Sequence, residues 1–347
     1  MSQNRQSAHM QQGEIAFRRM LRQQELSEMI HHPEILIGDE IMPVLADRIE
    51  ETRQVFAALS ARPITLAPFL ELGAERAQRS LAVRNEFDKR GFAIDLSLDA
   101  LQSAEWVRQR FGFAEMPLRV CGDAYNLPFR SNVFPFVFCF ATLHHFPDPL
   151  PIVRESLRVL QDGGHFYFDG EPTRGRLALR LWVRRGHRLS RPERWLSRIG
   201  ILGFVSEGGG LEREYGVLEN AFPLETWLNC IELFAHAEMQ VNRTLRIQFD
   251  PSRPSLKRHM AKLLGGVTRG LCFARKDEPP TRTVEWVEML RCPTCGSNGN
   301  ESRLMRMNTG EGLECPVCGV TYPQINGILV LLTPEQRQVL YPELRLD

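Results

Sequence analysis

The chain has 347 residues, of which 43% are hydrophobic and 24% charged, a composition typical of soluble globular proteins of about two domains. Its formal net charge of +1 does not by itself predict binding to nucleic acid or to an anionic membrane. The sequence contains no run of about 18 apolar residues, so we expect no membrane-spanning helix. The polar start lacks the apolar core of a secretory signal, so we expect a cytoplasmic protein with reduced cysteines.

Residues 1–62 are expected to be helical, because apolar side chains recur at helical spacing from Phe17 to Ile30 and again from Ile41 to Leu59. We interpret this region as a helical cap packed against the domain that follows. A dimerisation element and a lid over the substrate are the alternatives, and the sequence indicates no oligomeric state.

From residue 63 to residue 275 the sequence alternates short apolar strands with helical segments. The first five strands predict an α/β fold with a doubly wound, mostly parallel sheet, and two later strands are expected to complete it as an antiparallel hairpin. Ligands bind such sheets outside the carboxyl ends of the strands, so the polar residues there are the candidate site. The seven expected strands are Pro68–Leu72, Phe92–Leu96, Arg119–Cys121, Phe134–Phe140, His165–Asp169, Gln240–Phe249 and Thr268–Arg275.

Polar residues follow each of the first three strands. Glu71 and Gly73 lie where the first strand turns into a helix, and a glycine there allows a ligand to approach the backbone. Asp95 ends the second strand, where a carboxylate could accept two hydrogen bonds from a diol. Asp123 follows the third strand, in the segment Gly-Asp-Ala-Tyr-Asn-Leu-Pro-Phe. The structural alternatives are a helix cap at Asp95 or Ser97 and an Asx turn at Asp123.

A fourth motif follows the apolar strand that ends at Phe140. It reads Phe-Ala-Thr-Leu-His-His-Phe-Pro-Asp-Pro and contains His144 and His145, and Glu171 follows the fifth strand. Histidine titrates near neutral pH and a carboxylate can accept a proton, so these side chains are candidate catalytic groups. A structural role for the histidines is the alternative.

In this order the motifs resemble those of the class I S-adenosylmethionine-dependent methyltransferases, in particular the methyltransferase type 11-like group. The resemblance implies a Rossmann-like fold and S-adenosylmethionine as cofactor, with the ribose hydroxyls held by Asp95 and the adenine amino group by Asp123. The cofactor-binding residues that it implies are Glu71, Gly73, Ala74, Asp95, Leu96, Asp123, Ala124 and Phe140.

Glu75 and Ala77 stand where this family usually has glycines. A glutamate adds bulk and negative charge close to where the methionine carboxylate of the cofactor would lie. This departure leaves open a different class of function, in which a catalytically silent methyltransferase fold serves as a scaffold or binding subunit.

The reaction that the resemblance implies is an in-line displacement at a sulfonium, for which the protein supplies proximity and alignment. A hydroxyl acceptor would also need a base, and the candidates are His145, His144 and Glu171. We expect a small-molecule or saccharide acceptor. The alternative acceptor is RNA, although no Asn-Pro-Pro-Tyr-like motif follows the fourth strand.

Residues 173–240 are expected to be an insertion on the acceptor side, where Glu225-Thr-Trp227 resembles a segment of small-molecule and glycan methyltransferases. Nine arginines and one acid, Glu193, lie between Arg174 and Arg198, interleaved with leucine and tryptophan. The interpretations are a helical lid whose arginines pair with acids elsewhere, a clamp on a phosphate-bearing substrate, and a helix lying on an anionic membrane surface. The last would make a cytoplasmic protein peripheral to the membrane.

Residues 276–283 are expected to link this domain to a small module, residues 284–347. Two Cys-x-x-Cys pairs in the module could supply four thiolates to a structural zinc ion. The module resembles the small zinc-ribbon proteins that bind and stabilise methyltransferases, which implies that it braces the preceding domain or orients the acceptor. The predicted metal ligands are Cys292, Cys295, Cys315 and Cys318.

Overall fold

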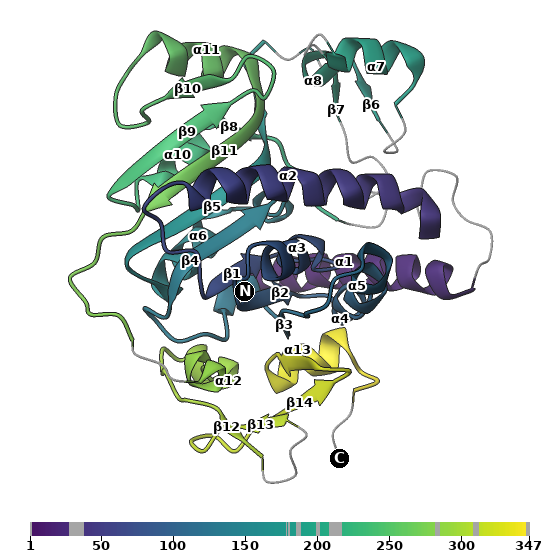
Figure 1. The fold of residues 1–347 in the computed structure, drawn as a ribbon, viewed down its shortest axis with the longest axis vertical. Coiled ribbons are helices and arrows are strands. Elements are labelled where there is room, and N and C mark those ends of the chain that lie inside the picture. Colours follow the sequence, from purple (N-terminus) through teal and green to yellow (C-terminus); the bar gives the residue numbers. More distant parts are fainter. Residues whose placement is uncertain are drawn as a thin grey trace.

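The computed structural model describes residues 2–27, 38–177, 179, 181–184, 189–198, 202–207, 217–281, 285–307 and 312–344. These residues form a mixed sheet of 13 strands, with helices on both faces, and a small second sheet of β6 (Trp182–Val183) and β7 (Ser206–Glu207) (Figure 1). One strand of the main sheet, β8 (Phe222–Pro223), pairs with β5 alone. The others, in spatial order, are β10 (Ile247–Phe249), β9 (His236–Val241), β11 (Gly265–Phe273), β5 (Leu160–Arg174), β4 (Phe134–Phe140), β1 (Phe69–Leu72), β2 (Gly91–Asp95), β3 (Leu118–Gly122), β15 (Ile328–Leu331), β14 (Thr321–Ile325), β13 (Gly312–Glu314) and β12 (Met305–Arg306).

The centre of the main sheet is parallel. β3, β2, β1, β4 and β5 lie side by side in one direction, and β11 runs antiparallel between β5 and β9. This order, in which the chain starts in the middle and builds outward on both sides, is that of a doubly wound α/β sheet. The predicted α/β class is confirmed, and the loops that follow β1 to β5 meet at one edge of the sheet.

The prediction of a seven-stranded, mostly parallel sheet was wrong. β15 pairs in parallel with β3, and the antiparallel strands β14, β13 and β12 continue the sheet beyond it. All four residues of β15 are buried, so this apolar strand covers an edge that β3 would otherwise expose. At the opposite edge the predicted strand Gln240–Phe249 is two strands, because Asn242 and Arg246 adopt positive φ angles and turn the chain between β9 and β10.

Helices cover both faces of the parallel strands. One face packs on α6 (Leu150–Val159) and α10 (Leu224–Ile231) in the largest apolar cluster. The other face packs on α2 (Met42–Ser60), whose Phe56 lies edge-on against Phe136 and Phe138 of β4. Helices α3 (Gln78–Glu86), α4 (Leu98–Gln102) and α5 (Ala104–Phe111) also lie on that side.

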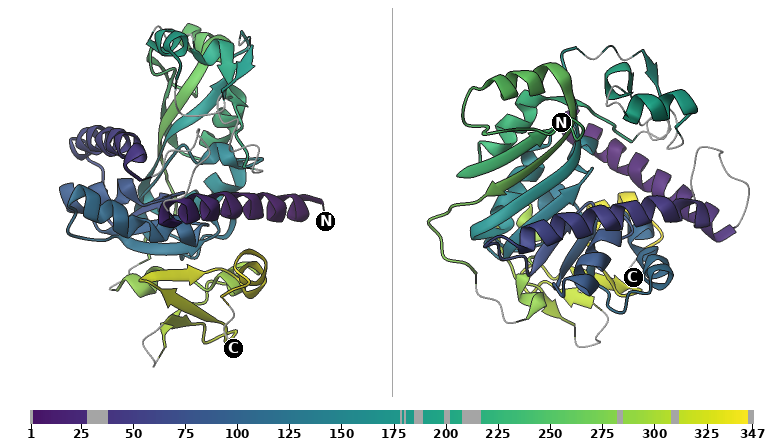
Figure 2. Two further views of the ribbon diagram at one scale, coloured as in Figure 1. Left: turned by 90° about the vertical axis from the view of Figure 1, so that its right-hand side faces the viewer. Right: turned by 45° about the horizontal axis from the view of Figure 1, so that its top comes forward.

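Helix α1 (Ser2–Ser27) lies against the body of the molecule, and its N-terminal end projects beyond it in the left view of Figure 2. Ile15 of α1 is buried in a cluster with Ala74, Leu98 and Tyr341. Among the described residues, no helix is both long enough and apolar enough to cross a membrane. The other helices are α7 (Arg191–Arg198), α8 (Leu202–Val205), α11 (Leu256–Leu264), α12 (Pro293–Gly296) and α13 (Pro334–Leu340), with short 3-10 turns η1 (Gly38–Ile41), η2 (Ala124–Asn126), η3 (Leu143–His145) and η4 (Trp286–Met289).

Candidate active site

The loops that follow β1, β2 and β4 are packed tightly together. Glu75 donates its backbone N–H to Oδ2 of Asp95 at 2.8 Å, which joins the first loop to the second. Gly73 has a φ of +64°, and a Cβ at this position would lie 2.5 Å from Oγ1 of Thr142 in the loop after β4. Glycine is therefore required at position 73 both by the backbone angle and by the lack of space.

Asp95 is held by backbone donors on both sides. Its two carboxylate oxygens accept the N–H groups of Glu75 and Ser97, each at 2.8 Å, and burial raises its pKa to about 6. Of the two residues that the sequence offered as a helix cap, Ser97 is the cap, because its hydroxyl accepts the N–H of Ala100. Each carboxylate oxygen of Asp95 retains a further lone pair with which it could accept from a diol.

Glu71 lies beneath this loop. Its side chain accepts the backbone N–H and the hydroxyl of Ser80 in α3, and burial raises its pKa to about 7. These bonds tie β1 to the helix that follows it. In this structure Glu71 therefore supports the loop from below, and its predicted contact with a cofactor stays a prediction.

Glu75 forms ion pairs with both N-terminal helices. Its carboxylate lies 2.8 Å from Arg18 of α1 and 2.5 Å from Arg48 of α2. Burial by itself would raise the pKa of Glu75, but Arg48 and Arg18 outweigh it and hold the pKa well below its usual range. The negative charge that the sequence places beside the candidate cofactor site is thus already balanced by two arginines.

Asp123 is contacted from two distant parts of the chain. Its Oδ2 accepts from the side-chain amides of Gln11 in α1, at 3.0 Å, and Gln336 in α13, at 2.7 Å. Its Oδ1 accepts the N–H of Tyr125 at 2.9 Å, which is the Asx-type bond that the sequence offered as the alternative. Burial raises the pKa of Asp123.

One face of α1 covers these residues. Gln11, Ile15 and Arg18 follow one another at intervals of four and three residues, so they lie on the same side of the helix. They reach Asp123, the apolar cluster that contains Ala74, and Glu75 respectively. The sequence predicted a cap or a substrate lid here but not this set of contacts. The pattern Gln-x-x-x-Ile-x-x-Arg was the only local signal for it.

Three other predicted cofactor residues lie at or just after the ends of these strands. Leu96 directly follows Asp95, and its carbonyl accepts from the hydroxyl of Tyr341 at 2.8 Å. Ala124 begins η2 and is half-buried. Phe140 ends β4, and the guanidinium of Arg79 lies 3.8 Å from the centre of its ring.

The candidate catalytic residues form one hydrogen-bonded group. Glu171 is fully buried and accepts the backbone N–H groups of Thr142, Leu143 and His144, so it shapes the loop after β4. It also lies 2.9 Å from Nδ1 of His144. The Nδ1 atom of His145 is 2.7 Å from the carbonyl of Leu218, and the two imidazole rings are 4.2 Å apart.

Glu219 completes this group and was missed by sequence reasoning. Its carboxylate lies 3.4 Å from Nε2 of His144 and 3.4 Å from Nδ1 of His145. Burial lowers the pKa of His144, but the carboxylates of Glu171 and Glu219 outweigh it and raise that pKa to about 10. His144, His145 and Glu219 each offer one ligand atom, and these three atoms lie within 4.8 Å of one another. The group could therefore also hold a metal ion.

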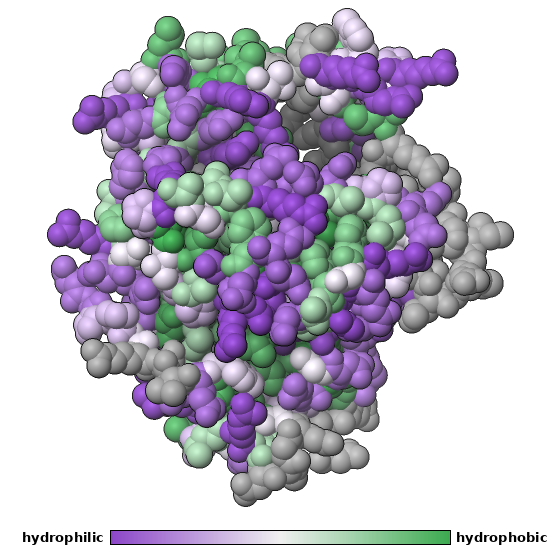
Figure 3. Space-filling model, in the orientation of Figure 1, coloured by the Kyte–Doolittle hydropathy of each residue, from purple (hydrophilic) through white to green (hydrophobic). Residues whose placement is uncertain are grey.

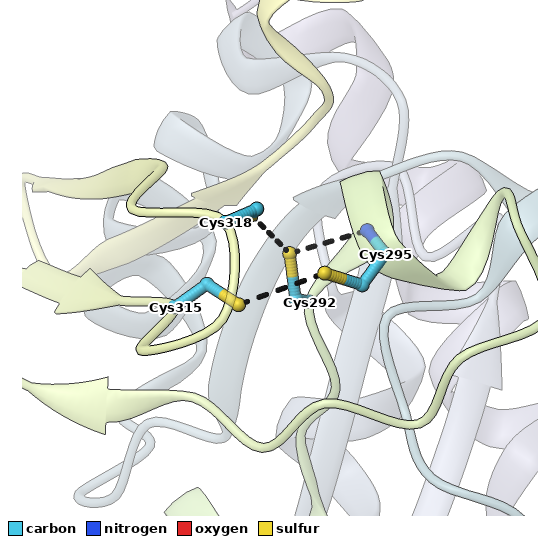
Figure 4. Close-up of side chains that lie close together, drawn as sticks. All are labelled: Cys292, Cys295, Cys315 and Cys318. Atoms are coloured by element: carbon cyan, nitrogen blue, oxygen red, sulfur yellow. Dashed lines mark hydrogen bonds between the residues drawn. The ribbon is translucent and has the colours of Figure 1, made fainter.

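The four cysteines of the C-terminal module converge, as Figure 4 shows. The sulfur atoms of Cys292 and Cys318 are 3.6 Å apart, and those of Cys295 and Cys315 are 3.8 Å apart. These separations far exceed the roughly 2.05 Å of a disulfide. They agree with the edge of a tetrahedron, about 3.8 Å, when each sulfur is about 2.3 Å from a central zinc ion.

Arg291, beside the first cysteine, joins the module to the candidate cofactor site. Its buried guanidinium donates to the carbonyl of Leu127 at 3.1 Å and to Oδ1 of Asn126 at 2.9 Å, and pairs with Glu155 at 3.2 Å. Both acceptors lie in the segment that follows Asp123. The module therefore holds that segment from outside the sheet, through residues that no local motif identified.

Residues 70–168 match the model of a family described as "Methyltransferase domain". The match begins in β1 and ends in β5, so it includes Gly73, Asp95, Asp123 and the two adjacent histidines. Together with the order of the parallel strands, this match supports a methyltransferase domain in this part of the chain.

The chain is also similar to several solved structures. A protein of Bacillus halodurans C-125, provisionally assigned as a methyltransferase, is 18% identical with a TM-score of 0.41, over 66% of this chain and 99% of the other. Haemonchus contortus phosphoethanolamine N-methyltransferase 2, in complex with phosphomonomethylethanolamine and S-adenosylhomocysteine, is 15% identical with a TM-score of 0.42. The match covers 65% of this chain and 53% of the other. A third structure is a complex of the Haloferax volcanii Trm112 methyltransferase activator with a provisionally assigned methyltransferase. One of its chains is 18% identical with a TM-score of 0.37, and the match covers 67% of this chain and 93% of the other.

Proposed function

We propose that this chain transfers a methyl group from S-adenosylmethionine to a small-molecule or saccharide acceptor, and that its C-terminal module is a zinc ribbon. The observation that carries the proposal is the position of Gly73, Asp95 and Asp123 after three adjacent parallel strands, β1, β2 and β3. The domain limits that we propose are those of the sequence: 1–62, 63–275 and 284–347.

The residues at the strand ends fit the chemistry of the cofactor. Asp95 and Asp123 offer carboxylate oxygens to the ribose diol and the adenine amino group. The charge of Glu75 is balanced by Arg18 and Arg48, so it would not repel the methionine carboxylate as a lone glutamate would. When bound, S-adenosylmethionine supplies an electrophilic methyl group, and the protein aligns the acceptor with it.

We assign removal of the acceptor proton to His145. Its Nδ1–H donates to the carbonyl of Leu218, which leaves Nε2 as the proton acceptor. The nearby carboxylate of Glu219 would stabilise the imidazolium that forms. His144 lies between Glu171 and Glu219, and its raised pKa means that it is already protonated at neutral pH, so it positions Glu219 instead of acting as the base.

The proposed zinc ion would be structural. The four thiolates match its preferred ligands and tetrahedral geometry and leave no open position for a substrate. Through Arg291 and Gln336 the ribbon would hold both sides of the Asp123 segment. This supports a bracing function and agrees with the implied relation to methyltransferase-activating zinc proteins.

A silent scaffold is the second candidate, and one observation favours it. Gln11 and Gln336 already donate to the Asp123 oxygen that the adenine amino group would use. For catalysis at least one of these amides must exchange with the cofactor. For a scaffold both could remain, with α1 as a permanent part of the core.

Calorimetric titration of the zinc-loaded, full-length protein with S-adenosylmethionine separates the two candidates. Micromolar binding that Asp95→Asn weakens at least tenfold would support the methyltransferase. The matched control is Asp88→Asn, an exposed aspartate whose loss should leave binding unchanged. A folded, zinc-replete protein that releases no heat with the cofactor would contradict the proposal and favour the scaffold.

A further inference from the structure

Exposed apolar side chains are concentrated at one end of the molecule. Of the thirteen large hydrophobic residues that are exposed in the described part of the chain, ten lie between residues 177 and 195 or between 245 and 263. Leu256 is 79% exposed, Leu179 68% and Trp195 61%. An isolated exposed leucine needs no explanation, but a concentration of this kind marks an interaction surface.

The two segments lie side by side. Arg176 donates its backbone N–H to the carbonyl of Lys262, and Leu177 donates to that of Leu263, both at 3.1 Å. The first segment therefore runs along the end of α11. Figures 1 and 3 show α11 and α7 at the same end of the molecule, where hydrophobic residues reach the surface among hydrophilic ones.

Helix α11 presents its apolar stripe outward. Leu256, Met260 and Leu263 recur at intervals of four and three residues and are all exposed, whereas Ala261 is the buried residue of this helix. In a helix that only packs on its own domain, such a stripe would face the core. The exposed stripe of α11 is therefore available to something outside the chain.

The same surface is strongly basic. Arg174, Arg176, Arg191, Arg194 and Arg198 are all exposed, and the segment between the first and the last of these has a single acid. In α7 the exposed Trp195 stands between arginines. A protein surface that lies on an anionic membrane combines three kinds of side chain. Leucines enter the boundary with the acyl chains, tryptophans lie at the membrane–water interface, and arginines bind the phosphates of the headgroups.

We propose that this end of the molecule, formed by α7, α11 and residues 174–177, 179 and 181–183, docks on the surface of an anionic lipid bilayer. The exposed leucines and Met260 enter the boundary between headgroups and acyl chains, and the arginines bind lipid phosphates. Nucleic acid shares the phosphate chemistry, but it would not cover an aliphatic stripe such as that of α11. The proposal is independent of catalysis, because the surface lies outside the candidate active site.

Vesicle co-sedimentation of the full-length, zinc-loaded protein tests the proposal. The probes are vesicles of equal parts phosphatidylcholine and phosphatidylglycerol, compared with pure phosphatidylcholine. We expect binding to the anionic vesicles that weakens more than tenfold in the triple variant Leu256→Ser, Met260→Ser, Leu263→Ser. A similar loss is expected for Arg191→Gln, Arg194→Gln, Arg198→Gln.

The matched control is Met305→Ser with Val339→Ser, two exposed apolar residues of the C-terminal module, which should bind as wild type does. Unchanged circular dichroism would show that each variant is folded. Wild-type protein that stays in the supernatant with anionic vesicles would overturn the proposal. So would triple serine variants that sediment fully, or binding to single-stranded RNA in place of vesicles.

Discussion

Replacing Glu75 with glutamine should destabilise the protein, although the two side chains are nearly the same size. The carboxylate is only 16% exposed and pairs with Arg18 at 2.8 Å and Arg48 at 2.5 Å. The amide carries no charge, so Arg48 would lose this ion pair and Arg18 would keep only its pair with Glu14, at 2.8 Å. Breaking a buried pair costs about 3–5 kcal/mol, and because both arginines reach solvent in part we expect a loss of about 2–3 kcal/mol.

Urea unfolding at pH 7 measures this loss. Glu75→Gly removes the same ion pairs, but glycine adopts the φ of +50° at this position without strain. The Glu75→Gly variant should therefore be about 0.5–1 kcal/mol more stable than the Glu75→Gln variant. The folded-state pKa of Glu75 is held below its unfolded value of 4.5, so its contribution is present at neutral pH and lost as the pH falls from 4.5 through the folded-state pKa. Wild type should therefore lose more stability on acidification than either variant. If Glu75→Gln unfolds at the wild-type urea concentration at pH 7, the ion pairs do not anchor the N-terminal helices and the reasoning is refuted.

Three further changes test other parts of the structure. Gly73→Ala should destabilise by about 2–3 kcal/mol in thermal unfolding, because the new methyl group would collide with Thr142 at a positive φ, and an unchanged Tm would contradict this packing. Removal of zinc by a chelator should lower the Tm and weaken cofactor binding, because Arg291 would no longer hold the Asp123 segment. If the zinc-free and zinc-loaded proteins bind the cofactor with equal affinity, the C-terminal module does not brace this segment. His145→Gln should lower kcat about 100-fold or more on a hydroxyl acceptor while leaving cofactor affinity unchanged, and wild-type kcat would exclude His145 as the base.

The central strands and their loops could be predicted because their signals are local. β1 to β4 are short apolar segments bounded by polar loops, and Asp95, Asp123 and the two histidines end or follow them in the sequence. β5 is longer than the predicted His165–Asp169 and includes Glu171, which was expected to follow the strand. Parallel pairing then brings these loops to one edge of the sheet without further information. The cysteine pairs were equally local, since a knuckle is defined by four consecutive residues.

What sequence reasoning missed depends on contacts between distant residues. Glu219 reaches His145 from within the insertion, and nothing near it in the sequence marks it as part of a site. The contact of Gln11 with Asp123 joins positions more than a hundred residues apart. β15 lies within the predicted C-terminal module, but its pairing with β3 could not be predicted from composition or periodicity.

The pairing of β15 with β3 also has a consequence for synthesis. The strand that closes this side of the parallel sheet leaves the ribosome about 200 residues after the strand it covers. Until then β3 presents unpaired N–H and C=O groups to other nascent chains. If the module folds only with zinc, the supply of the metal determines how long that edge stays open, and zinc shortage would appear first as aggregation of newly made protein.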